Sequence, residues 1–217
     1  RVAGMLSGKA GIINIHMGDG KTNLDYLNRA VEETELPIYQ FLPTHMGRNP
    51  DLFEEGIKYM KKGGYCDFTG ADDPDLWERE YGEVRISKAL KRIIDEEISY
   101  DLFTFTSDGQ GSFPMFDENN NYIGLGMGKS SCLLEAIQEC VFKEDIPLRG
   151  LTINPAKILK LKGKGQILPG YDADFNLLDE KTLEIHSVFA KGKTMVHDRK
   201  LKVLGTFDPG QEGFPKA

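Results

Sequence analysis

Two histidines follow short apolar segments near the start of the chain. His16 ends an alternating apolar run at residues 11–16, and His45 follows a second run at residues 37–42. If both runs are neighbouring parallel strands, about 4.8 Å apart, both imidazoles can reach one metal ion at about 2.0–2.1 Å. One histidine at a strand end is more often a packing or capping residue. Two histidines at equivalent strand ends favour a metal site.

A carboxylate follows a third segment of the same kind. Asp108 comes just after the apolar run at residues 102–106. In a closed barrel the rim curls, so that strands distant in the order converge on one mouth. Histidine, histidine and aspartate at three strand ends therefore indicate a hydrolytic zinc site more than packing.

Two further residues are candidates for substrate binding. The planar guanidinium of Arg48, three residues after His45, suits a carboxylate held bidentately. The alternative is a surface arginine beside a helix that we expect to start with Asp51 as its N-cap. Ser112, in the string Gly-Gln-Gly-Ser, could bind substrate through its hydroxyl or only shape a tight loop. This loop is not a phosphate-binding motif, because the third glycine and its helix do not follow in register.

Strands and helices alternate through the first part of the chain. We expect four strand–helix units: strands at 11–16, 37–42, 65–69 and 102–106, and helices at 22–35, 51–62, 85–97 and 130–142. Such units build a parallel α/β sheet, either open or closed as a (β/α)8 barrel. Polar residues past the carboxyl ends of the strands favour the barrel, where the active site lies at that end.

The segment between the third strand and its helix, and the part of the chain after residue 160, differ from these units in composition and pattern. Residues 71–83 are rich in acidic residues, and we expect a long loop there, either over the mouth or as a solvated insertion. Turn residues follow, and short strands at 173–178, 185–190 and 193–197 then predict a small β element. Strand alternation accounts for the two histidines in that element, His186 and His197. We expect a barrel portion at 1–160, a sandwich portion at 161–205 and a loose tail at 206–217.

Composition excludes several classes of protein. The 217 residues contain 27 Lys+Arg and 34 Asp+Glu, a formal charge of −7, so nucleic acid is not the expected partner. No apolar run approaches the roughly 18–20 residues of a membrane helix, so we expect no membrane association. The three cysteines do not form a CxxC pair, and we interpret them as reduced thiols in a cytoplasmic protein.

The motifs together resemble the metal-dependent amidohydrolases, and among these the isoaspartyl (β-aspartyl) dipeptidases. The narrower strings are Pro-Thr-His-x-x-Arg-Asn at 43–49 and Ser-Asp-Gly-x-Gly-Ser at 107–112. His-Met-Gly-Asp at 16–19 also fits the dipeptidases. Thr-Ile-Asn-Pro-Ala at 152–156 and the glycine-rich string at 163–174 are found across the superfamily, where they mark the return from barrel to β-sandwich. The resemblance covers nearly the whole chain except its tail.

The resemblance implies roles for five residues. His16 and His45 correspond to the ligands of the second of two Zn²⁺ ions, and Asp108 to the carboxylate that binds the first ion and carries the proton. Arg48 and Ser112 correspond to substrate contacts. The implied reaction is hydrolysis of the β-aspartyl amide by a metal-bridging hydroxide, whose proton Asp108 passes to the leaving amine. The partners implied are a β-aspartyl peptide substrate and further copies in a homo-oligomer.

The family pattern also has parts that this sequence lacks. Family members carry a His-x-His on the first barrel strand and a carbamylated lysine that bridges the metals, and neither is found here. We therefore expect the C-terminal half of the barrel, strands five to eight, with the C-terminal part of a small β-sandwich. We expect such a chain to be incomplete and inactive alone. The alternatives are a cyclic-amide hydrolase of the dihydropyrimidinase or dihydroorotase type, and a non-catalytic assembly module on the same scaffold.

Overall fold

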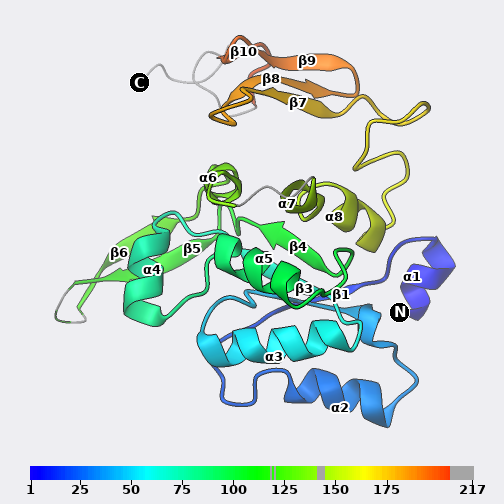
Figure 1. Cartoon of the computed structure of the whole chain (residues 1–217), viewed down its shortest axis with the longest axis vertical. Coiled ribbons are helices and arrows are strands. Elements are labelled where there is room, and N and C mark those ends of the chain that lie inside the picture. Colours follow the sequence, from blue (N-terminus) through cyan, green and yellow to red (C-terminus); the bar gives the residue numbers. More distant parts are fainter. Residues whose placement is uncertain (118, 120, 141–144, 206–217) are drawn as a thin grey trace. The chain divides into compact units, whose positions relative to one another are not determined.

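The computed structural model describes residues 1–117, 119, 121–140 and 145–205 (Figure 1). The chain divides into two compact units, Arg1–Leu161 and Lys162–Ala217, and each is described by itself. The division falls close to the expected domain boundary after residue 160. The proposed tail, residues 206–217, lies outside the described residues.

Four short parallel strands organise the first unit: β1 (Ile13–His16), β2 (Phe41–Thr44), β3 (Cys66–Thr69) and β4 (Phe103–Thr106). β1 pairs with β2, and β3 pairs with β4, both in parallel register. Across the middle, the Met46 amide donates to the Asp67 carbonyl at 3.0 Å, which places β2 beside β3. The strands therefore lie in chain order, and the expected α/β architecture is confirmed.

Helices connect the strands and supply the core. They are α1 (Val2–Ser7), α2 (Asp25–Glu33), α3 (Pro50–Lys61), α4 (Pro74–Tyr81), α5 (Ile86–Asp95), α6 (Cys132–Gln138), α7 (Ile146–Arg149) and α8 (Ile153–Ile158). Helices α3 and α5 both contact β3. Their inward faces are apolar at helical spacing, with Leu52 and Ile57 from α3 and Leu90 and Ile93 from α5 at most 2% exposed. Burial of these faces holds the strands in place from one side.

Two assignments on either side of His45 differ from the sequence prediction. Residues 37–42 were expected as a strand, but Ile38–Gln40 is a 3-10 turn and the strand runs from Phe41 to Thr44. Pro37 fixes the entry to this turn, and the Gln40 amide donates to its carbonyl. The expected N-cap at Asp51 is also wrong. Asn49 caps α3, because Pro50 occupies the first turn and the Leu52 amide bonds the Asn49 side chain.

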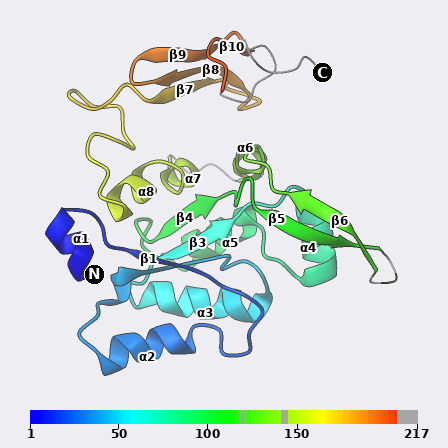
Figure 2. The same ribbon diagram turned by 180° about the vertical axis from the view of Figure 1, so that it is seen from behind.

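Several segments carry structure that the sequence prediction missed or misplaced, and the short helices α1, α7 and α8 are among those missed. Residues 71–83 are not simply a loop: Pro74–Tyr81 forms α4, with Asp73 accepting from the Leu76 amide. The strands β5 (Ser112–Phe116) and β6 (Tyr122–Met127) form an antiparallel hairpin that extends away from the parallel strands (Figure 2). The helix expected at 130–142 is described only as Cys132–Gln138, and residues 141–142 lie outside the described residues.

The second unit is an antiparallel sheet in the order β10-β9-β8-β7. Its strands are β7 (Phe175–Leu178), β8 (Ile185–Ala190), β9 (Lys193–His197) and β10 (Lys200–Leu201). Phe175 and Phe189 stack across β7 and β8, with ring centroids 4.6 Å apart. The small β element expected here is present, with β10 as an additional short strand.

Two general features bear on the class of protein. The three cysteines are free and buried, and burial raises the pKa of the Cys132 and Cys140 thiols to about 11. They are therefore packing residues with little thiolate at neutral pH. Within the described part of the chain, every helix is too short or too polar to cross a membrane.

Candidate metal centre

The structure brings His16, His45 and Asp108 together at one end of the parallel strands. One ligand atom from each lies within 4.8 Å of the other two. His16 Nδ1 is 2.9 Å from His45 Nε2, and His45 Nε2 is 3.9 Å from Asp108 Oδ2. These three side chains come from strand ends that are far apart in the sequence, as the sequence prediction requires.

The backbone turns sharply at two of the three positions. His45 directly follows β2 with a φ of 65°, and Asp108 lies two residues after β4 with a φ of 46°. Non-glycine residues seldom adopt this left-handed conformation, which costs of order 1–3 kcal/mol and is concentrated at functional sites. Here the left-handed conformation turns the chain just after each strand. Both side chains therefore lie at the carboxyl end of the parallel strands, near His16.

The second nitrogen of His45 has its own partner. His45 is 8% exposed, and its Nδ1 lies 2.9 Å from the Thr69 hydroxyl, at the end of β3. If Nδ1 carries the proton and donates to Thr69, the Nε2 lone pair faces His16 and Asp108. Burial lowers the pKa of His45, the Arg48 cation lowers it further, and Asp108 opposes this shift. The neutral imidazole that metal binding requires is thus favoured.

The donor atoms are of the types that zinc binds. Two imidazole nitrogens and a carboxylate oxygen are the ligands that catalytic zinc sites use, with Zn–N of about 2.0–2.1 Å. Two nitrogens at that distance in a tetrahedral site lie about 3.3–3.4 Å apart. The observed 2.9 Å between His16 and His45 is close to this separation, so a small ring movement would admit the ion.

A cavity of about 230 Å³ adjoins the three residues, and its lining includes Asn14, Thr44, Asp67, Thr104 and Thr106. Asp67 is 1% exposed and accepts hydrogen bonds from the three threonine hydroxyls. Burial raises the pKa of this carboxyl, and the hydroxyl donors partly offset the shift. Sequence reasoning missed both Asp67 and Thr69. A charged residue inside an otherwise apolar strand was the available signal for Asp67.

Arg48 lies in the loop that follows His45. Its Nη1 is 4.0 Å from Asp19 Oδ2, and its guanidinium is near enough to lower the pKa of His45. The Val84 amide donates to the Gly47 carbonyl at 2.6 Å, which anchors this loop to the segment after α4. With 41% of its side chain exposed, Arg48 is available to an anion at the rim.

Ser112 is the first residue of β5 and is exposed. The Gly111 amide donates to the Asp108 carbonyl at 2.9 Å, so the chain turns back tightly between Asp108 and Ser112. Among the interactions of the described residues, none joins the Ser112 side chain to the three ligand candidates. Its place in a substrate site thus rests on proximity along the chain.

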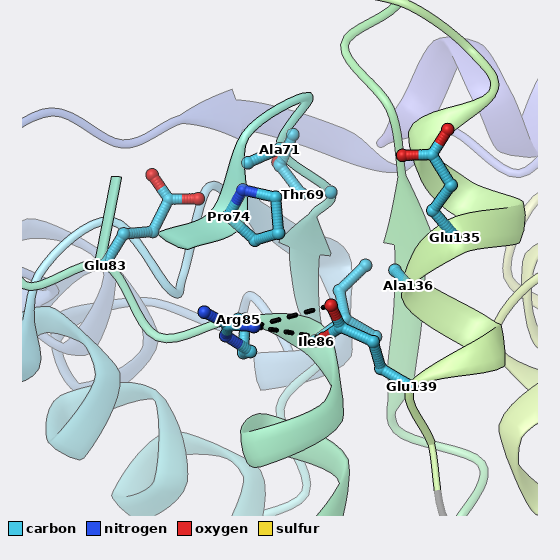
Figure 3. A pocket seen from close by; sticks show the side chains of 10 residues that line it. Thr69, Ala71, Pro74, Glu83, Arg85, Ile86, Glu135, Ala136 and Glu139 are labelled. Carbon is cyan, nitrogen blue, oxygen red and sulfur yellow. Dashed lines mark hydrogen bonds and ion pairs between the residues drawn. The ribbon is translucent and has the colours of Figure 1, made fainter. Parts of the chain in front are cut away.

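A second cavity of about 230 Å³ is lined by Thr69 and by residues of α4, α5 and α6 (Figure 3). The Arg85 guanidinium reaches Glu139 at 3.4 Å across it and Asp75 at 2.5 Å. Glu83 also lines this cavity, and burial raises the pKa of its carboxyl to about 7. The ion pairs of Arg85 join three helices, a structural role.

The comparison with known families agrees with the geometry. The sequence model described as the amidohydrolase family matches residues 84–195, just over half of the chain. The chain belongs to the amidohydrolase family. Amidohydrolases are in general metal-dependent, in keeping with the ligand-type residues at the strand ends.

Solved structures place the chain more closely within the amidohydrolases. A β-aspartyl dipeptidase from Fervidobacterium islandicum, in complex with β-Asp-Leu dipeptide, is 40% identical with a TM-score of 0.82. It covers 95% of this chain, and the match spans 53% of the dipeptidase. The resemblance to β-aspartyl dipeptidases that the motifs indicated is confirmed. The chain spans about half the length of that relative.

More distant proteins share the fold or part of the sequence. Atrazine chlorohydrolase from Arthrobacter aurescens, complexed with zinc, is 14% identical with a TM-score of 0.53, covering 94% of this chain and 48% of its own. At that identity the match shows the fold alone. An adenine deaminase from Thermosipho africanus is 23% identical over 175 residues, 73% of this chain and 29% of the deaminase.

Proposed function

We propose that the protein containing this chain is a zinc-dependent β-aspartyl dipeptidase. The observation that carries the proposal is the convergence of His16, His45 and Asp108 in a chain 40% identical to a β-aspartyl dipeptidase. In this proposal His16 Nδ1 and His45 Nε2 hold one ion, and Asp108 contributes to its neighbour. A bound Zn²⁺ lowers the pKa of its water to about 7, which supplies hydroxide at neutral pH.

The residues of this chain have distinct tasks in that reaction. The Asp108 side chain is half exposed, so it can take a proton from the attacking water and return it to the leaving amine. Arg48 binds a substrate carboxylate through its planar fork. We assign Ser112 to a further substrate contact, because it follows Asp108 by four residues after a tight turn.

The same proposal assigns the architecture. We infer that β1 to β4 are strands five to eight of a (β/α)8 barrel, and that β7 to β10 belong to a small β-sandwich. The remaining metal ligands, including a bridging carbamylated lysine, would come from residues outside this chain. The 53% coverage of the dipeptidase supports this division. A homo-oligomer and a cytoplasmic location remain expectations from the resemblance.

The adenine deaminase match favours one alternative, hydrolytic deamination of a purine on the same scaffold. A substrate panel decides between them. The full-length, zinc-loaded protein is assayed with β-Asp-Leu, α-Asp-Leu, dihydrouracil and adenine. Hydrolysis of β-Asp-Leu at least 100-fold faster than the other three supports the dipeptidase. Preferred turnover of adenine or dihydrouracil, or none of the four with zinc bound, contradicts it.

A further inference from the structure

Asp67 is a charged residue that the proposed reaction does not use. It lies in the middle of β3 with 1% of its surface exposed. Burying a carboxylate is unfavourable unless its oxygens are hydrogen-bonded. Here the donors are neutral hydroxyl groups on the two neighbouring strands. One carboxyl group and three hydroxyl groups therefore lie together inside the sheet.

The hydroxyls come from both strands that flank β3. Asp67 Oδ1 accepts from Thr104 at 2.5 Å, and Asp67 Oδ2 accepts from Thr106 at 2.6 Å, both on β4. Oδ2 also accepts from Thr44 on β2. We call these four residues the aspartate–threonine clamp. One side chain thereby joins three strands, beyond their backbone hydrogen bonds.

Three of the four clamp residues lie within two positions of a candidate ligand or of Thr69, which contacts one. Thr44 directly precedes His45, and Thr106 lies two residues before Asp108. On β3 itself, Thr69 lies two residues after Asp67, on the same face, and contacts His45 Nδ1 at 2.9 Å. The clamp therefore connects β2, β3 and β4 close to the strand ends that carry His45, Thr69 and Asp108.

We propose that Asp67 is a positioning residue that sets the separation of His45 and Asp108 for metal binding. This inference rests on the proposed function, since it concerns the same metal centre. An amide in place of the carboxylate replaces one acceptor oxygen by a donor, so the hydroxyls that face this atom must rotate to accept, and the geometry of the clamp changes. His45 and Asp108 then move relative to each other, although neither is changed.

The test compares two equally buried polar residues in the full-length protein. Asp67→Asn removes an acceptor of the clamp. Asn154→Asp is the matched control, because Asn154 is 0% exposed and its Nδ2 donates to the Tyr100 and Phe103 carbonyls without contacting the clamp. Zinc affinity is measured by chelator competition, and kcat and KM are measured with β-Asp-Leu. The separation of His45 Nε2 and Asp108 Oδ2 is measured by crystallography of the zinc-free proteins.

We expect Asp67→Asn to weaken zinc affinity and to lower kcat by about 10–100-fold each, with KM changed less than threefold. The separation should change in the zinc-free crystal structure. Asn154→Asp should lower Tm but leave zinc affinity, and kcat per folded molecule, within twofold of the wild type. Unchanged zinc affinity and kcat in folded Asp67→Asn would overturn the proposal.

A second series covers the case in which Asp67→Asn does not fold. Thr106→Val removes one clamp hydroxyl next to Asp108, whereas Thr106→Ser keeps it. Zinc affinity that falls at least fivefold in the valine variant and recovers in the serine variant supports the clamp. Equal affinities overturn it. If the wild type binds zinc but does not cleave β-Asp-Leu, the proposed function fails while the zinc comparison still tests Asp67. A wild type without zinc overturns both.

Discussion

His16 Nδ1 faces His45 Nε2 at 2.9 Å, although the two residues lie 29 positions apart in the sequence. The ring centroids are 4.8 Å apart and the planes meet at 64°, so the contact is edge-on rather than stacked. Parallel pairing of β1 with β2 produces it, because His16 is opposite Thr44 and His45 follows directly. In the proposed metal centre, two nitrogens held this way would form a preorganised pair of ligands.

Removal of either histidine should empty one metal position. We expect the full-length wild type to hold about two zinc ions per chain, and His45→Ala to hold at most one, with kcat reduced at least 100-fold. Elemental mass spectrometry of the purified proteins measures this. His186→Ala is the control, because His186 is half exposed in the second unit. Full zinc occupancy in His45→Ala would rule out the assigned ligand role.

Asp108→Asn should lower the rate of the chemical step, measured as kcat, more than it weakens substrate binding. General acid–base catalysis contributes about 10²–10⁴-fold, so we expect kcat for β-Asp-Leu to fall within that range while KM changes less than threefold. Steady-state kinetics with zinc-saturated protein provides the measurement. A variant that keeps kcat within threefold of wild type would show that another group transfers the proton.

Arg48→Ala should weaken recognition of a substrate carboxylate. A charge-assisted hydrogen bond contributes about 1.5–3 kcal/mol, so kcat/KM for β-Asp-Leu should fall about 10–150-fold. Arg48→Lys should recover only part of this loss, since an ammonium lacks the bidentate fork. Arg79→Ala is the control, because Arg79 is exposed and pairs with the adjacent Glu80. An unchanged kcat/KM in Arg48→Ala would favour the cyclic-amide alternative.

Glu83 should make stability depend on pH. Burial raises the pKa of this carboxyl from 4.5 to about 7 in the folded protein, with Asp19 adding to the shift and Arg48 opposing it. Between these values the folded state binds more protons than the unfolded state, so stability falls as pH rises from about 4.5 through 7. Glu83→Gln removes this loss. Its stability relative to wild type, from urea unfolding, should increase between pH 5 and pH 8; a constant difference would contradict the assigned pKa.

Gly47 should tolerate no side chain. A Cβ at this position would meet the Val84 carbonyl, and the Val84 amide already bonds the Gly47 carbonyl at 2.6 Å. We expect Gly47→Ala to lower the free energy of unfolding by about 1–3 kcal/mol, as overpacking does. Gly20→Ala is the control, because nothing lies within 4 Å of its Cβ. Equal unfolding midpoints for both variants in urea would show that the loop accommodates the methyl group.

The local elements were predictable where one periodicity was clear. The strands at β8 and β9 match the expected 185–190 and 193–197, because turn residues at Gly192 and Asp198 bound an alternating pattern. The 3-10 turn at Ile38–Gln40 was not predictable, since its apolar residues are equally suited to a strand. Helix α4 was missed because the acidic composition of its segment was interpreted as a loop, although Asp73 and Pro74 are a typical N-cap and first residue of a helix.

By itself, the sequence determined the ligand types, the strand–helix alternation and the motifs that indicate an amidohydrolase. Those features depend on residue type and local spacing, which propensity and periodicity record. Only the tertiary structure decided that Thr69 holds the second nitrogen of His45 and that Asp67 joins three strands through Thr44, Thr104 and Thr106. Such contacts depend on which strands become neighbours and in what register, and these are set by long-range packing that no local pattern encodes.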